Sequence, residues 1–295
     1  MSALTQASLL DRDKIYPAIG TFLAITALLC AIVSTIIVEM GLKKFYLALL
    51  MWTPALAAYL TMKLFRKNWH MLGIVPCRSR PLFWSYLLPL LYGGMAYGLI
   101  WALGLGAIGN EGFYKEVAYL TGAAGWSETR LIITGFILLG TIGMLWHITT
   151  SFGEELGWRG FLVLQLYRKM SFFWTAVFSG LVWASWHMPI ILFANYNAGP
   201  EGLWIQVVNF TILCVSMSFP MAYYRITSGS VLPATLMHAA HNVFVLSFFH
   251  PLTLRYDFPV RYTGEFGLIL PAVIALFALF YWNKASKEGI SGPIH

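Results

Sequence analysis

Eight long apolar stretches limit most strongly how this chain can fold. Each is close to or above the ~18–20 residues that a helix needs to cross a lipid bilayer. They lie at about 17–38, 45–62, 82–108, 131–152, 171–193, 203–224, 231–249 and 265–282. The sequence therefore predicts an all-α fold, a polytopic membrane protein built as a bundle of about eight transmembrane helices.

The composition agrees with a membrane protein. Of the 295 residues, 59% are hydrophobic and only 11% are charged, whereas roughly 25% of the residues of a soluble domain are charged. Too few charged side chains are therefore present to cover a water-facing surface. Aromatic residues make up 16% of the chain, and several lie near the ends of the apolar stretches, where aromatic belts form at membrane interfaces.

We expect one integral membrane domain over residues 1–295, with the motif-bearing core at 131–249. Only 63–81 and 109–130 are long enough to form substantial loops, and neither resembles a soluble domain. The first apolar stretch, 17–38, is too long for the hydrophobic region of a cleavable signal peptide. It is predicted to be the first spanning helix.

The distribution of Lys and Arg predicts the orientation. With the N-terminus in the cytoplasm, 13 of these residues flank the cytoplasmic ends of the helices and 6 flank the other ends. Because positive charge favours the cytoplasmic side, we predict a multi-pass protein of the plasma (inner) membrane with both termini in the cytoplasm. The net charge of +7 is assigned to orientation and to contact with anionic lipid headgroups, and no nucleic-acid partner is predicted.

The segment GEELGWR at 153–159 places three charged side chains beside an apolar run. Glu155 and Arg159 are four residues apart, so on a helix they share a face and can pair, whereas Glu154 is rotated away by about 100°. Apolar sequence continues on both sides, which favours a position facing the bundle interior or a watery cavity, where ionisable groups are candidates for function. Under the predicted topology this segment lies at the cytoplasmic end of the fourth helix.

Two further polar patches lie inside apolar stretches. In WASWHMPI, His187 follows Trp183 by four residues, and further along the chain His238 and Asn242 share a helical face with His241 partly adjacent. A single such residue is often an interhelical hydrogen-bonding group. Three polar side chains in one apolar segment are harder to explain as lipid-facing, so we treat both patches as candidate site residues.

Other polar residues receive a structural interpretation. His147 lies seven residues before Glu154 on the same face, which is weak evidence that it lines the same cavity. Cys30, Cys77 and Cys214 are far apart and form no CxxC pattern, so neither a disulfide framework nor a thiolate metal site is indicated.

Together the candidate residues supply what the hydrolysis of a peptide bond by water requires. Glu154 and His187 can orient and deprotonate a water, while His238 and Asn242 can stabilise the oxyanion that forms. A Glu with two His could also hold zinc and leave one position open, and the spacing does not decide between these alternatives. The chain has no HExxH metalloprotease helix, no GxSxG nucleophile elbow and no GxxxxGKS or GxxxxGKT phosphate loop.

The three motifs resemble those of the CAAX-protease and bacteriocin-processing family (CPBP, or Abi), which includes the type II CAAX prenyl endopeptidases. The family's EExxxR motif matches Glu154, Glu155 and Arg159. Its second motif, an aromatic residue four positions before His, matches 183–187 with Trp in place of the usual Phe, and its HxxxN motif matches 238–242. All three occur in the order that the family shows.

The resemblance implies an all-helical membrane endopeptidase whose cavity opens to the cytoplasmic face. The first Glu of EExxxR would activate water with the His of the second motif, and the HxxxN pair would form the oxyanion site. Glu155 and Arg159 would support the structure, and Trp183 and His241 are assigned to the pocket. The family's prenyl proteases look metal-independent, so the expectation is no cofactor, with zinc as the less favoured alternative.

The expected substrate is a peptide or a lipidated or membrane-associated protein, cleaved near the cytoplasmic face. The string EELGWRGFL resembles the bacterial branch of the family, which argues against a prenylated substrate. The alternative function is a non-catalytic bacteriocin-immunity or scaffold protein that binds a peptide or regulator in the same cavity. A proton-linked carrier is a further alternative, which the lack of visible internal repeats disfavours.

Overall fold

The structure is a computed structural model, and it describes residues 10–254 and 261–292. Within that part of the chain, eight helices are long and apolar enough to cross a membrane. The predicted all-α polytopic membrane fold is confirmed. The spans are Arg12–Met40, Lys44–Leu64, Ser79–Ala102, Glu128–Tyr167, Phe172–Phe193, Leu203–Ser228, Leu232–Leu252 and Ile269–Lys287.

The described residues form the following helical elements, most of which belong to the spans. The α-helices are α1 (Ile15–Met40), α2 (Lys44–Leu64), α3 (Ser79–Ala102), α4 (Glu111–Thr121), α5 (Glu128–Leu138), α6 (Met144–Glu155), α7 (Val163–Tyr167), α8 (Phe172–Phe193), α9 (Leu203–Ser228), α10 (Leu232–His241), α11 (His250–Leu252) and α12 (Ile269–Lys287). Short 3₁₀ helices are η2 (Arg12–Lys14) and η3 (Trp69–Leu72). Wider π-helical turns are η4 (Leu139–Gly143), η5 (Leu156–Leu162) and η6 (Asn242–Phe249).

The fourth span corrects the predicted boundary at residue 152. Its helix continues from Glu128 to Tyr167, a length of 40 residues, with π-helical turns after α5 and after α6. The GEELGWR segment therefore lies inside a continuous helix that ends at Tyr167, and not where the helix ends. Single π-helical turns inside α-helices are frequent at functional sites. Of the three that the described residues form, one begins directly after Glu155 and one begins at Asn242.

Two other boundaries differ from the prediction. The apolar stretch 82–108 ends as a helix at Ala102, and Ala107–Ile108 (β1) instead pairs antiparallel with Thr253–Leu254 (β2). The stretch 265–282 becomes helical only at Ile269. In both cases the apolar stretch is longer than the helix, because some of its apolar residues lie in the neighbouring connection. The predicted loop 109–130 also contains a helix, α4.

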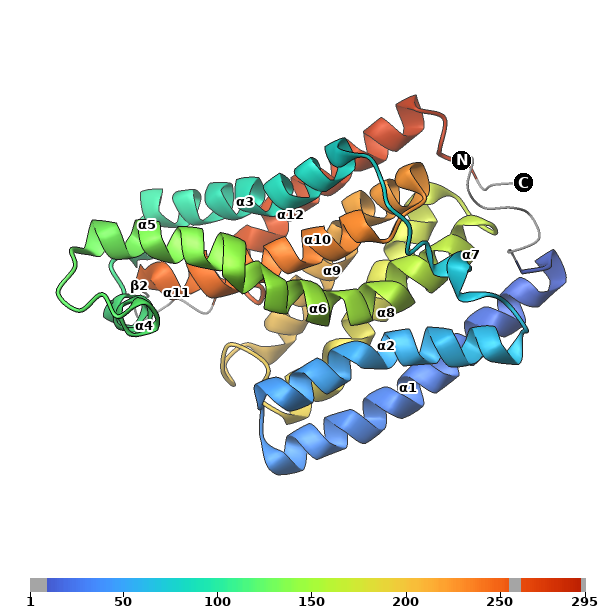
Figure 1. The fold of residues 1–295 in the computed structure, drawn as a ribbon, viewed down its shortest axis with the longest axis horizontal. Coiled ribbons are helices and arrows are strands. Elements are labelled where there is room, and N and C mark those ends of the chain that lie inside the picture. Colours follow the sequence, from blue (N-terminus) through green and yellow to red (C-terminus); the bar gives the residue numbers. More distant parts are fainter. Residues whose placement is uncertain (1–9, 255–260, 293–295) are drawn as a thin grey trace.

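The helices pack as one bundle with α10 near its centre, as Figure 1 shows. α1 and α2 lie side by side along one flank, and α3 and α12 lie side by side along the other. α10 packs against α3, α6 and α9, while α6 also packs against α2 and α8 packs against α9.

Glycines let two helix pairs approach closely. A Cβ added at Gly157 would lie 2.7 Å from the Pro54 carbonyl oxygen of α2, and one added at Gly180 would lie 2.9 Å from the Val215 backbone nitrogen of α9. Backbone atoms cannot move aside as a flexible side chain can. The α8–α9 packing therefore depends on the absence of a side chain at Gly180.

We predict that Gly180→Ala lowers the stability of the folded protein by about 1–3 kcal/mol, because the added methyl group forces α8 and α9 apart. Gly98→Ala in α3 is the matched control, since it adds the same methyl group to a helix where no heavy atom lies within 4 Å. Thermal unfolding in detergent should show a lower Tm for the first variant only. Equal Tm values for the two variants would contradict the close packing.

Candidate active site

A cavity of about 90 Å³ lies inside the bundle. It is lined by residues of α2, α6, α8, α9, α10 and η6, and of the connections before α9 and α12. A water needs about 10–15 Å³ of such volume and several polar partners, so the cavity can hold several waters. The sequence-predicted residues that line it are Glu154, Trp183, His187, His238, His241 and Asn242. Three patches that are far apart along the chain thus meet at one place.

Glu154 is held by two indole rings. It is 1% exposed, and its Oε2 accepts hydrogen bonds from Trp183 Nε1 at 2.7 Å and from Trp158 Nε1 at 3.3 Å. An indole N–H can only donate, so both contacts require that oxygen to be an acceptor. They fix the orientation of the carboxyl group and leave its other oxygen available to the cavity.

Glu155 and Arg159 form the predicted pair, and the structure adds a third member. Arg159 Nη1 donates to Glu155 Oε1 at 2.9 Å, and His238 Nδ1 contacts the same oxygen at 2.9 Å. Arg159 also donates to Ser218 Oγ at 2.9 Å and lies over the Trp183 ring, 4.5 Å from its centre. Both charged side chains are fully buried. This pair therefore joins α6 and η5 to α9 and positions the His238 ring.

The hydrogen bonds of the two predicted imidazoles assign their tautomers. His187 Nδ1 contacts the Trp183 carbonyl oxygen at 3.0 Å, and a carbonyl oxygen can only accept, so Nδ1 carries the hydrogen. The same argument applies to His238 Nδ1 against the Glu155 carboxylate. In both rings Nε2 remains for other partners. Asn242 begins η6 one helical turn after His238, with its side chain at the cavity.

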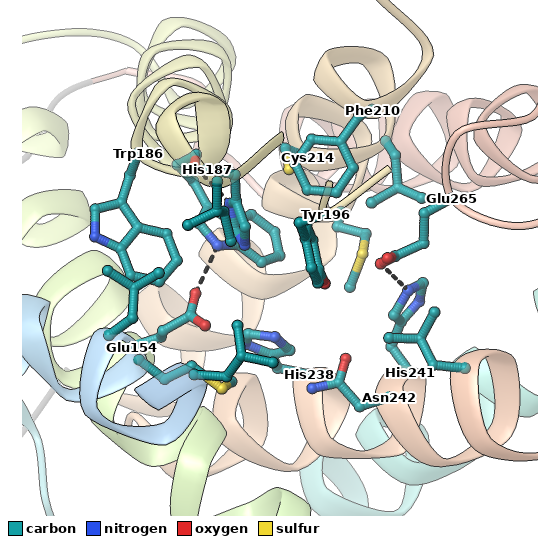
Figure 2. A pocket seen from close by; sticks show the side chains of 18 residues that line it. Glu154, Trp186, His187, Tyr196, Phe210, Cys214, His238, His241, Asn242 and Glu265 are labelled. Atoms are coloured by element: carbon teal, nitrogen blue, oxygen red, sulfur yellow. Dashed lines mark hydrogen bonds and ion pairs between the residues drawn. The ribbon is translucent and has the colours of Figure 1, made fainter. Parts of the chain in front are cut away.

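His241 belongs to a second carboxylate–imidazole couple that the sequence did not predict. Its Nδ1 contacts Tyr92 Oη at 2.7 Å, and its Nε2 contacts Glu265 Oε1 at 3.0 Å. Figure 2 shows Glu154 and Glu265 on opposite sides of the cavity, with His238 between them. The cavity is therefore flanked by two carboxylates, each held by ring nitrogens.

Glu265 lies in the connection before α12 and is 8% exposed. Burial raises the pKa of its carboxyl group, but the hydrogen bond and charge of His241, with smaller contributions from His187 and His238, more than offset this effect. The pKa of Glu265 consequently lies below its ordinary value. A neighbouring phenol shows the opposite effect, since burial and the two carboxylates keep the pKa of Tyr196 well above 10.

Sequence reasoning missed Trp158, Tyr92 and Glu265 as contributors to the site. Trp158 had a usable signal, because it follows Glu154 by four residues just as Arg159 follows Glu155. Glu265 had a weaker one, a lone acidic residue directly before the last apolar stretch.

His147 does not line the cavity within the described part of the chain, and its Nε2 contacts Ser247 Oγ at 3.3 Å. The weak evidence that placed it at the cavity was therefore misleading. Two residues that share a helical face but lie two turns apart need not line the same cavity.

Several side chains around the cavity are of the types that ligate metals. Among the residues that the structure describes, no three His, Cys, Asp or Glu side chains converge closely enough to hold a metal ion. Glu154 faces two indole donors, and the Nδ1 atoms of His187 and His238 are engaged by a carbonyl and a carboxylate. One oxygen of Glu154 and the Nε2 atoms of both rings are therefore left for a group inside the cavity.

Comparison with known proteins finds a family match over much of the motif-bearing region. Residues 134–244 match the family described as type II CAAX prenyl endopeptidase Rce1-like, which confirms the resemblance that the three motifs predicted. The CAAX prenyl protease 2 of Methanococcus maripaludis is 25% identical over 135 residues, 44% of this chain and 48% of that protein. The chain thus matches about half the length of this relative. The eight apolar helices of the described residues support a multi-pass membrane protein, and its motif-bearing region is similar to the CAAX prenyl endopeptidases.

We predict that Glu155→Gln destabilises the protein by about 3–5 kcal/mol, because it leaves the buried Arg159 without its counter-charge. Glu111→Gln is the matched control, since Glu111 and Lys115 form a pair with the same spacing, 3.0 Å apart, whose side chains are 81% and 79% exposed. Exposed pairs contribute little to stability. Thermal unfolding should show a large loss for the first variant and no measurable change for the second, and similar effects would contradict the structural role of Glu155.

Proposed function

We propose that the protein is an intramembrane endopeptidase of the glutamate type, which uses water to cleave a peptide or a membrane-associated protein. The observation that carries the proposal is the convergence of Glu154, His187, His238 and Asn242 on one cavity large enough for water. The family match over residues 134–244 supports the same class of activity.

The first step is the activation of water. The free oxygen of Glu154 and the Nε2 atom of His187 are both acceptors, so they can take the two O–H bonds of one water and leave an oxygen lone pair for attack. As that oxygen bonds to the carbonyl carbon of the substrate, Glu154 takes its proton. The carbonyl double bond opens, and its oxygen becomes the oxyanion of the tetrahedral intermediate.

The second step is the stabilisation and collapse of this intermediate. His238 Nε2–H and the Asn242 amide donate to the oxyanion. A donor at Nε2 requires both ring nitrogens of His238 to carry hydrogen, and the Glu155 carboxylate provides the counter-charge at Nδ1. Collapse breaks the carbon–nitrogen bond, and the proton held by Glu154 passes to the leaving nitrogen. The products are a carboxylic acid and an amine.

We predict that Glu154→Gln abolishes cleavage while the protein stays folded, because the amide still accepts from the two indole rings but cannot take a proton. Comparative peptidomics of cells that carry either version reports activity and substrate together, and shows whether the substrate is lipidated. An unchanged product pattern would remove Glu154 as the base. If Glu154→Gln also restores the phenotype of a deletion strain, the non-catalytic immunity or scaffold function is supported instead.

Three histidine variants extend the same experiment, and one of them serves as the control. His187→Gln and His238→Gln should each lower the cleavage rate by at least 100-fold, in line with the usual contribution of a general acid–base or oxyanion group. His147→Gln changes a histidine of the same bundle that does not line the cavity, so it should retain activity. Equal losses for all three variants would indicate a general structural effect.

The metal-free mechanism has a separate test. We expect the cleavage rate of the purified protein to persist after thorough chelation, because Glu154 activates water without a Lewis acid in this proposal. Loss of activity on chelation, followed by its restoration with zinc alone, would support the zinc alternative and overturn the metal-free mechanism.

A further inference from the structure

A second hollow lies on the outer surface of the bundle, away from the proposed active site. It is a groove of about 530 Å³ between α3 and α12, with Tyr224 of α9 in its lining. Figure 1 shows α3 and α12 side by side along one flank of the bundle. No residue of the active-site cavity lines this groove, so it is a separate feature.

The walls of the groove are apolar and face outward. On α3 they are formed by Trp84, Leu88, Leu91 and Met95, which follow one another at intervals of three or four residues and so form one stripe. Of these, Leu91 is 41% and Met95 is 54% exposed. On α12, Phe280 completes the opposite wall and is 58% exposed. In a membrane this surface faces lipid chains.

The length of the groove matches one leaflet. From Trp84 to Met95 the apolar stripe rises roughly 16 Å at 1.5 Å per residue, and half of the hydrocarbon core is about 15 Å. One acyl chain can therefore lie along the whole stripe, with space left at the Arg80 end for a headgroup. An empty groove of this kind would lose dispersion contacts on both walls.

Two cations stand at one end of the groove. Arg80 lies in the first turn of α3 and Lys284 lies near the end of α12, and both line the groove. Neither forms an ion pair with a carboxylate in the described part of the chain. Glu288, one helical turn after Lys284, instead accepts a hydrogen bond from Tyr223 Oη at 2.6 Å.

We propose that this groove binds an anionic phospholipid, with one acyl chain along the apolar stripe and the phosphate between Arg80 and Lys284. Lys284 already lies over the Tyr223 and Tyr281 rings, 4.9 and 5.8 Å from their centres, which holds the ammonium group at the mouth of the groove. The two cations give the site its preference for a headgroup with net negative charge. Under the predicted topology this end faces the cytoplasm, where anionic lipids are concentrated.

The two walls of the groove are also linked to the active-site cavity. α3 carries Tyr92, which contacts His241 at 2.7 Å, and α12 follows directly after the connection that carries Glu265. A lipid that fills the space between α3 and α12 would hold together the two elements that flank His241. We therefore expect binding to stabilise the folded protein.

The test uses the full-length protein in detergent, with phosphatidylglycerol and phosphatidylcholine of identical acyl chains as probes. Native mass spectrometry should show one phosphatidylglycerol retained per chain and much less phosphatidylcholine, and thermal unfolding should show a higher Tm with phosphatidylglycerol only. The double variant Arg80→Gln/Lys284→Gln should bind phosphatidylglycerol about 30-fold more weakly, as expected for the loss of two cations near an anionic lipid.

The matched control is Arg78→Gln/Lys287→Gln. It removes the same charge from the same ends of the α3 and α12 segments, but at exposed positions outside the groove, and it should bind phosphatidylglycerol normally. Glycerol phosphate, which has the headgroup chemistry without a chain, should not displace the lipid. Equal retention of the two lipids, equal weakening in both double variants, or displacement by glycerol phosphate would each overturn the proposal. None of these results depends on peptidase activity.

Discussion

The buried contact of Glu155 with Arg159 and His238 is the interaction on which the rest of the site depends. Charges in the interior of a membrane bundle are costly unless they are paired and hydrogen-bonded. Here one carboxylate oxygen receives both Arg159 and His238, and Arg159 also reaches Ser218. This network explains how a chain with so few charged residues keeps Glu155 and Arg159 buried inside one helix. It binds α6, α9 and α10 together and leaves Glu154 outside the pair.

Glu154 has a different environment from its neighbour in sequence. Its partners are the N–H groups of Trp158 and Trp183, which orient the carboxyl group without supplying a formal positive charge. Adjacent acidic residues thus have separate roles because a helix turns them about 100° apart. One supports the fold and the imidazole of His238, and the other faces the cavity with His187. The second couple, His241 with Glu265, closes the far side of the same space.

The sequence predicted the spans and the convergence of its motifs, but not the contacts between distant segments. Hydropathy gave eight helices because lipid selects long apolar segments, and the four-residue spacing correctly paired Glu155 with Arg159. It placed the GEELGWR segment at a helix end, because charge normally marks the edge of a span. The structure shows Glu155 and Arg159 paired inside the helix, with further contacts to His238 and Ser218, 83 and 59 residues away in the chain. No local pattern reports such partners, and the same is true of the contact between Tyr92 and His241.

The central claim is that one water is shared by side chains from three separate helices. An experimental density map of the protein in lipid, at a resolution that shows ordered waters, tests this most directly. The account predicts a water within hydrogen-bond distance of both the Glu154 carboxylate and His187 Nε2, on the side of the cavity that His238 and Asn242 face. Glu154, His187 and His238 in separate environments, with no water that could contact more than one of them, would contradict it.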